Sequence, residues 1–119
     1  MLGNINFQIW FKVARPIKAK YKLATNCTLV LNGAYVLSKV TNKPFTRRQL
    51  RSFASYYNAN KINTYITVLI VKGFIVKSYD KATREYYTIS EIGLQVIKEL
   101  NESYERELYL FCSDHSIEL

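Results

Sequence analysis

Two groups of side chains in this sequence have the chemistry to recognise a polyanion. Arg47, Arg48 and Arg51 lie close together, and guanidinium groups bind phosphate oxygens with two parallel hydrogen bonds. A second, polar group follows a few residues later: Asn60, Lys61, Asn63, Thr64 and Thr67. Asn matches the hydrogen-bonding edge of adenine, and Lys matches that of guanine. We therefore expect the first group to hold a nucleic-acid backbone and the second to read base edges.

The charge distribution favours the same kind of partner. Thirteen Lys and Arg residues precede Asp80, which is the first acidic residue of the chain. From Asp80 onward, nine acidic residues outnumber four basic ones, and the formal net charge of the whole chain is +8. Segregation of this kind creates a positive field over one part of a surface, and phosphate backbones are the obvious partner. The alternative for the arginine group is an ordinary solvated helix face.

A capping box predicts the helix that carries the arginines. Thr46 and Gln49 have the spacing at which each side chain bonds to the backbone of the other, so a helix is expected to begin at Arg47. This helix should bury Leu50, Phe53 and Ala54.

The polar group lies on the next expected helix. Asn60 is placed to cap this helix, and Gly73 to end it. Its apolar face is formed by Ile62, Ile66, Leu69 and Ile70, which leaves the polar group on the opposite face. Asn58, in the turn before it, is expected to contact the nucleic-acid backbone. Asn58 and Asn60 serve equally well as plain turn and cap residues.

A β-hairpin is expected to follow. Residues 74–79 and 84–89 are rich in β-forming side chains and are joined by a polar tip. Lys77, Lys81 and Arg84 would place positive charge against the flanking backbone or in a minor groove. Ser90 is expected to cap the last helix.

The flanking segments are expected to be helical. Residues 5–13 alternate as a strand does, yet Ile9, Val13, Ile17 and Tyr21 form a helical stripe, and we favour a helix despite Pro16. A second helix should start with a cap at Thr25 or Asn26. Its apolar face is expected to contain Val30, Ala34, Leu37 and Val40, and it should end at residues 42–44.

The last helix carries an apolar stripe that is longer than a small core needs. The stripe predicts a dimerisation surface formed by Ile97, Leu100, Tyr104, Leu108 and Phe111. This helix is also acidic, at Glu99, Glu102, Glu105 and Glu107. The first helix is basic, at Lys12, Arg15, Lys18, Lys20 and Lys22. The basic helix could touch DNA, or it could pair with the acidic helix of another subunit.

The order of these elements resembles that of the MarR (multiple antibiotic resistance regulator) family of winged helix-turn-helix proteins. The similarity is carried by Ile62, Ile66 and Leu69 with residues 72–75, and by residues 86–93. It implies a mainly α fold with a small antiparallel β-wing. The single domain at 1–119 would comprise an N-terminal helical segment at 1–24, the winged helix-turn-helix core at 25–90 and a C-terminal helix at 91–119. It also implies N- and C-terminal dimerisation helices and, with Tyr35 and the aromatic first helix as its lining, a possible small-molecule effector pocket.

Other classes of function find little support in the sequence. It contains no Gly-rich phosphate loop and only one His, so we expect no enzyme activity, no cofactor and no metal site. No apolar run is long enough to cross a membrane, and the chain is expected to be cytoplasmic. Cys27 is either a small buried thiol or, beside a helix start, a redox-sensing thiol.

We therefore predict a homodimer that binds double-stranded DNA sequence-specifically, most simply a transcriptional regulator that represses from an operator. Two alternatives remain. One is a winged-helix interaction or structural module, for example in a phage or mobile-element assembly. The other is a replication or plasmid-maintenance factor. Tyr56, Tyr57 and Tyr65 are expected in the core, although stacking on nucleotides is an alternative.

Overall fold

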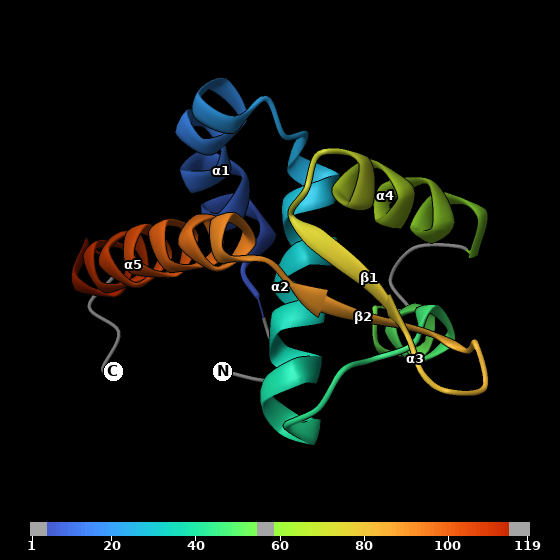
Figure 1. The fold of residues 1–119 in the computed structure, drawn as a ribbon. Coiled ribbons are helices and arrows are strands. Elements are labelled where there is room, and N and C mark those ends of the chain that lie inside the picture. The colour runs from blue at the N-terminus through green and yellow to red at the C-terminus, as the bar shows by residue number, and fades with distance from the viewer. Residues whose placement is uncertain (1–4, 55–58, 115–119) are drawn as a thin grey trace.

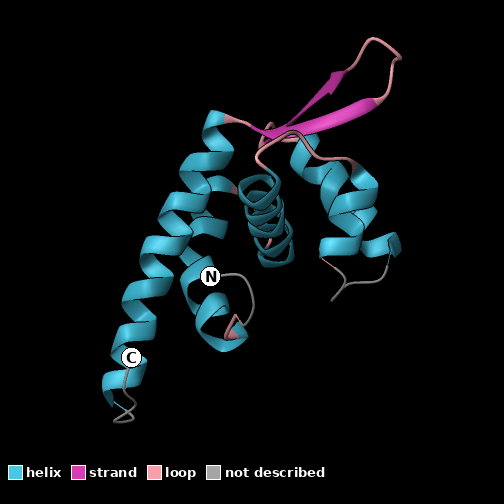
Figure 2. Cartoon of the chain, turned by 90° about the horizontal axis from the view of Figure 1, so that it is seen from below, coloured by secondary structure: helices cyan, strands magenta, loops and turns pink. Residues whose placement is uncertain are grey.

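The computed structural model describes residues 5–54 and 59–114. It confirms a mainly helical fold with a small antiparallel wing, and its elements in chain order are α1 (Phe7–Tyr21), α2 (Thr25–Thr41), α3 (Arg47–Phe53), α4 (Ala59–Val71), β1 (Ile75–Tyr79), β2 (Glu85–Ile89) and α5 (Glu91–Asp114). α2 runs through the centre, with α1 and α5 on one side (Figure 1). α3, α4 and the hairpin lie on the other side, and the hairpin projects from the helical body (Figure 2).

The N-terminal segment is a helix, as favoured. Asn6 caps it, since its Oδ1 accepts a hydrogen bond from the backbone N–H of Ile9 with an N···O distance of 3.1 Å. Burial follows a helical period, because Ile9 and Val13 are buried whereas Phe11 between them is exposed. Pro16 lies inside α1 on its exposed side, where the missing N–H leaves no buried group unpaired.

α2 supplies much of the core, and two expectations about its ends are corrected. Its N-cap is Ala24, so neither expected cap is used: Thr25 is already helical, and Asn26 donates its amide to Tyr65 Oη at 3.0 Å. At the other end Val40 is 60% exposed. The reason is that the final turn of α2 extends beyond the core, and Leu37 is the last buried residue of this helix.

The capping box at the start of α3 is confirmed. The Thr46 hydroxyl accepts from Gln49 N–H at 3.1 Å, and the Gln49 side-chain oxygen accepts from Thr46 N–H at 2.8 Å. Leu50 and Ala54 are fully buried, but Phe53 is 39% exposed, contrary to expectation. Ala54, one residue later, occupies the inward position.

α4 presents its expected apolar face to the core, where Ile62, Ile66 and Leu69 are buried. Asn60 lies inside the helix, which begins at Ala59, so the expectation that Asn60 is its cap is wrong. Tyr57 and Asn58, which were expected in the preceding turn, lie outside the described part of the chain, as does Tyr56, which was expected in the core.

The hairpin begins after Gly73, whose φ of +82° is the left-handed conformation expected at a helix end. β1 and β2 pair antiparallel, with Ile75 opposite Ile89, and each strand starts within one residue of its expected position. Phe45 extends the pairing, because its backbone exchanges two hydrogen bonds with that of Tyr87, at 3.0 and 2.8 Å.

Ser90 caps α5 as expected, since its hydroxyl accepts from Gly93 N–H at 3.1 Å. α1 and α5 run antiparallel, with ion pairs from Lys12 to Glu107 at 2.8 Å and from Lys20 to Glu99 at 2.7 Å. These pairs join the basic and acidic helices within one chain. No helix in the described ranges is both long and apolar enough to cross a membrane.

The apolar stripe of α5 also has a partner inside the chain. Ile97, Leu100 and Tyr104 are buried in the core, where the ring of Tyr104 lies 5.7 Å from that of Trp10 in α1. These three expected dimerisation residues are therefore packed inside one chain. Leu108 and Phe111, nearer the end of α5, are half-buried.

Candidate nucleic-acid interface

The outward face of α4 is polar, as expected. Asn60, Lys61, Thr64 and Thr67 are exposed, and Asn63 is half-buried. Two hydroxyls donate to carbonyls one turn earlier: Thr64 to Asn60 O at 3.0 Å, and Thr67 to Asn63 O at 2.9 Å. Each hydroxyl keeps its acceptor capacity toward a ligand.

Asn63 differs from the other polar residues of α4. Its side-chain oxygen is buried and accepts no hydrogen bond within the described residues. Its backbone oxygen accepts from two side chains, the Thr67 hydroxyl and Arg47 Nη1, the latter at 3.4 Å. A buried acceptor without a donor is costly to the fold.

The three arginines of α3 do not act as one group. Arg48 is exposed, whereas Arg47 and Arg51 are half-buried. The guanidinium of Arg47 lies over the ring of Tyr87, 5.7 Å from the ring centre. Sequence reasoning placed all three arginines against phosphates; that role stays a prediction, and Arg48 is the most exposed of the three.

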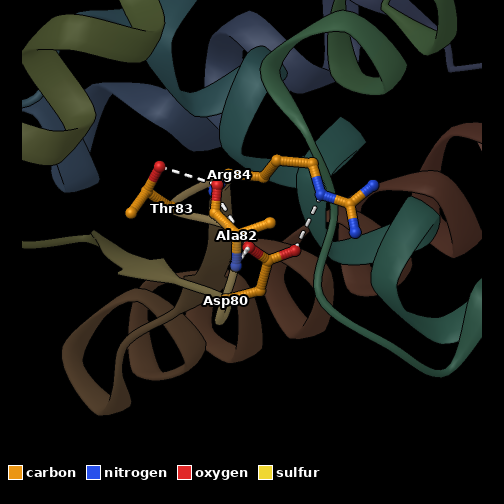
Figure 3. Close-up of polar contacts among 4 residues, drawn as sticks. All are labelled: Asp80, Ala82, Thr83 and Arg84. Atoms are coloured by element: carbon orange, nitrogen blue, oxygen red, sulfur yellow. Dashed lines mark hydrogen bonds and ion pairs between the residues drawn. The ribbon is translucent and has the colours of Figure 1, made fainter.

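The wing holds its arginine through Asp80 (Figure 3). One carboxylate oxygen of Asp80 accepts from the backbone N–H groups of Ala82 and Arg84, at 2.8 and 2.9 Å. The other accepts from Arg84 Nε at 2.8 Å, and the pKa of the Asp80 carboxyl is lowered chiefly by the backbone hydrogen bond from Arg84. The side chain of Arg84 is therefore directed by a local network while remaining exposed.

Lys77 and Lys81 are the other expected wing residues, and both are exposed. Lys77 lies 3.6 Å from a carboxylate oxygen of Glu85 on the neighbouring strand. Glu85 also accepts from the Tyr87 hydroxyl at 2.7 Å, and this bond is the main cause of the lowered pKa of its carboxyl. Sequence analysis missed Glu85 and Tyr87. The hairpin register could have indicated Tyr87, since it pairs Tyr87 with Lys77, which was already a candidate residue.

Comparison with known proteins identifies the fold. No protein-family profile matches the sequence, and no curated protein matches it either. MepR, a transcription regulator of the Staphylococcus aureus multidrug efflux pump MepA, superposes with a TM-score of 0.71 at 10% identity, over 91% of this chain and 76% of its own. A MarR-family transcriptional regulator from Silicibacter pomeroyi gives a TM-score of 0.62 at 13% identity, over 89% of this chain and 68% of its own. The chain has a MarR-like winged-helix fold.

A further match is to a structure that contains DNA. A MepR mutant bound to an oligodeoxyribonucleotide has a TM-score of 0.69 at 11% identity, over 90% of this chain and 75% of its own. In the MarR-like fold of the present chain, α3, α4 and the hairpin lie together on one side of α2 (Figures 1 and 2).

The MarR-like fold also contains a groove of about 710 Å³ between α2 and α5. Trp10, Tyr35 and Tyr104 are among its lining residues, and an effector pocket at this groove stays a prediction. Burial raises the pKa of the Cys27 thiol, although Lys72 opposes this, so the small buried thiol is the better description of Cys27. Among the described residues, no three His, Cys, Asp or Glu side chains gather at a common point.

Proposed function

We propose that this protein is a homodimeric transcriptional regulator that binds double-stranded DNA sequence-specifically and represses by occupying its site. The observation that carries the proposal is the exposed polar face of α4, which lies beside a wing whose arginine is directed by Asp80. A helix of this kind fits the major groove, and a basic hairpin fits the adjoining backbone or minor groove. The similar MepR structure with bound oligodeoxyribonucleotide supports the same partner.

The residues divide by role. Asn60, Lys61, Asn63, Thr64 and Thr67 would meet base edges. Arg48, Lys77, Lys81 and Arg84 would meet phosphates, since their exposed side chains can follow a curved backbone.

A second copy of the chain would be bound by the free end of the α1–α5 pair. Phe7 and Phe11 of α1 are 45% and 46% exposed, and Tyr109 and Leu110 of α5 are 63% and 49% exposed. Because α1 and α5 run antiparallel, these four side chains lie toward the same end of the molecule. We call the four side chains the terminal apolar patch. It replaces the buried part of the α5 stripe as the proposed dimer surface.

Selection of bound duplexes from a random DNA pool tests the proposal directly. The selected duplex is then titrated against a scrambled duplex of equal length at physiological salt. We expect a palindromic site bound ~1,000-fold or more above the scrambled duplex. Recovery of no motif, with only salt-sensitive micromolar binding, would instead favour a structural or interaction module.

A further inference from the structure

Arg47 has two contacts that tie different parts of the fold together. Its Nη1 donates to the backbone oxygen of Asn63 in α4, at 3.4 Å. Its guanidinium also lies 5.7 Å from the centre of the Tyr87 ring in β2, within the range of a cation–π contact. Arg47 therefore lies between the polar helix and the base of the wing, whereas its neighbour Arg48 is exposed to solvent.

Tyr87 is a rigid base for this contact. The ring is 1% exposed and stacks on Phe45, with 6.2 Å between ring centres. Its backbone pairs with that of Phe45, and its hydroxyl donates to Glu85 at 2.7 Å. Glu85 in turn lies 3.6 Å from Lys77, across the hairpin. A continuous series of contacts thus runs from the wing through Tyr87 and Arg47 to the backbone of α4.

We propose that Arg47 is a positioning residue, which fixes the distance between the base-facing turn of α4 and the wing, and that it is not a phosphate ligand. The proposal rests on the DNA-binding function proposed above. A planar guanidinium can stack on a ring and donate within its own plane at once, whereas a Lys ammonium lacks this geometry. The carbonyl that Arg47 holds belongs to Asn63, so a shift of Arg47 is transmitted to that base-reading position.

The test compares Arg47→Lys and Arg47→Ala with Arg48→Ala in the full chain. Each variant is titrated with the selected duplex, with its single-base variants and with scrambled DNA, at several salt concentrations. Arg48→Ala should weaken binding to all duplexes alike and reduce the salt slope by about 0.9, as expected for one lost phosphate contact. Both Arg47 variants should keep the wild-type salt slope and bind the selected duplex ~10-fold more weakly, with little change on scrambled DNA.

Two results would overturn the proposal. One is a uniform loss for the Arg47 variants with a reduced slope, which would make Arg47 a phosphate ligand. The other is wild-type discrimination in Arg47→Lys, which would show that charge alone is sufficient. Arg47→Lys keeps the charge and most of the side chain, so this variant still tests the proposal if Arg47→Ala does not fold.

A separate measurement without DNA distinguishes failure of this inference from failure of the proposed function. If the wild-type chain binds every duplex alike, sequence-specific binding is wrong, and the role of Arg47 in specificity falls with it. Amide hydrogen exchange still tests the coupling. Arg47→Lys should speed exchange in both α4 and the hairpin, whereas Arg48→Ala should change neither, and unchanged exchange in Arg47→Lys would contradict the coupling.

Discussion

At the scale of single residues, Asn63 combines a strained environment with a candidate binding role. Its buried side-chain oxygen lacks a donor among the described residues, although its backbone oxygen accepts from Thr67 and Arg47. Buried unpaired acceptors are uncommon in native proteins, and a ligand is one explanation for them. A base edge with an exposed amino group would supply the missing donor, so DNA binding would relieve the cost carried by the free protein.

Asn63→Ala should therefore separate stability from recognition. We expect the free energy of unfolding in urea to rise by about 1 kcal/mol, because the unpaired acceptor is removed and Ala is the better helix former. Binding to the selected duplex should weaken by ~1 to 3 kcal/mol, with relaxed preference at one base position.

The matched control is Asn101→Ala, because the Asn101 amide donates to Ile97 O at 3.0 Å. It should leave DNA binding unchanged and should not stabilise the protein. A uniform loss of DNA affinity in Asn63→Ala, without relaxed preference, would contradict direct base reading by Asn63.

Side-chain contacts were predictable from the sequence where the two partners are close together in the chain. Thr46 and Gln49 are three positions apart, and both capping bonds form. Arg47 and Tyr87 lie far apart in the chain, so only the fold brings them together, and the sequence pattern could not separate Arg47 from Arg48. Asn60 shows the opposite error: its side chain suits a helix cap, but α4 already begins at Ala59, so the expected start was too late.

At the scale of elements, the junction between the wing and α5 depends on close backbone packing. A Cβ on Gly93 would lie 2.3 Å from the carbonyl oxygen of Phe74 and 2.7 Å from Cγ2 of Ile89. The carbonyl of Phe74 also accepts from Ser90 N–H at 3.1 Å, at the start of α5. The direction in which the hairpin leaves the helical body is thus set by a contact that only glycine permits.

Gly93→Ala should lower the free energy of unfolding by about 2 kcal/mol, as overpacking against a backbone atom does. Gly73→Ala is the control, because a Cβ there meets open space and only the left-handed φ of +82° is penalised, at about 1 kcal/mol. Urea unfolding of both variants measures the difference. Equal losses would show that the space around Gly93 can relax.

Element types were predictable where the local composition was distinctive. The hairpin segments are rich in β-forming side chains and are joined by a polar tip, and the strands form within one residue of the expected positions. The segment that became α1 fits both periods, and its type is decided by packing on α5, which no local pattern contains.

At the scale of the whole molecule, the α1–α5 pair packs the first described helix against the last. The sequence showed that one helix is basic and the other acidic, but contacts within a chain and between chains give the same pattern. The structure places both ion pairs within one chain. The pKa of the Glu99 carboxyl is lowered from its ordinary value of 4.5, chiefly by the hydrogen bond from Lys20.

This pKa shift predicts an acid-sensitive contact. A lowered folded-state pKa means that the Glu99 carboxylate stabilises the fold at neutral pH, and that this contribution is lost as the pH falls below 4.5 through the folded pKa. Melting temperatures between about pH 7 and about pH 3 should therefore fall less in Glu99→Gln than in the wild type. Glu102→Gln, on an exposed position of the same helix, should follow the wild-type curve. Parallel curves for Glu99→Gln and wild type would remove this pair from the acid response.

The terminal apolar patch makes the oligomeric state testable. The double variant Phe7→Ser, Phe11→Ser should sediment as a monomer at concentrations where the wild type is a dimer, because two exposed rings are lost from the proposed interface. Val40→Ser, at an exposed apolar residue of α2, is the control and should remain dimeric. A double variant that stays dimeric would place the interface elsewhere.

Charge is distributed unevenly along the molecule, although the basic α1 offsets part of the negative charge of α5. Its longest dimension is 54 Å, and the second half of α5, with Glu102, Glu105 and Asp114, extends away from the hairpin (Figure 1). Arg48 and Lys81 are exposed on the opposite side of α2. A nearby polyanion therefore exerts a torque that turns the hairpin and α4 toward it and the end of α5 away. Rotation in the long-range potential would thus precede contact, and its benefit would shrink as added salt shortens the reach of that potential.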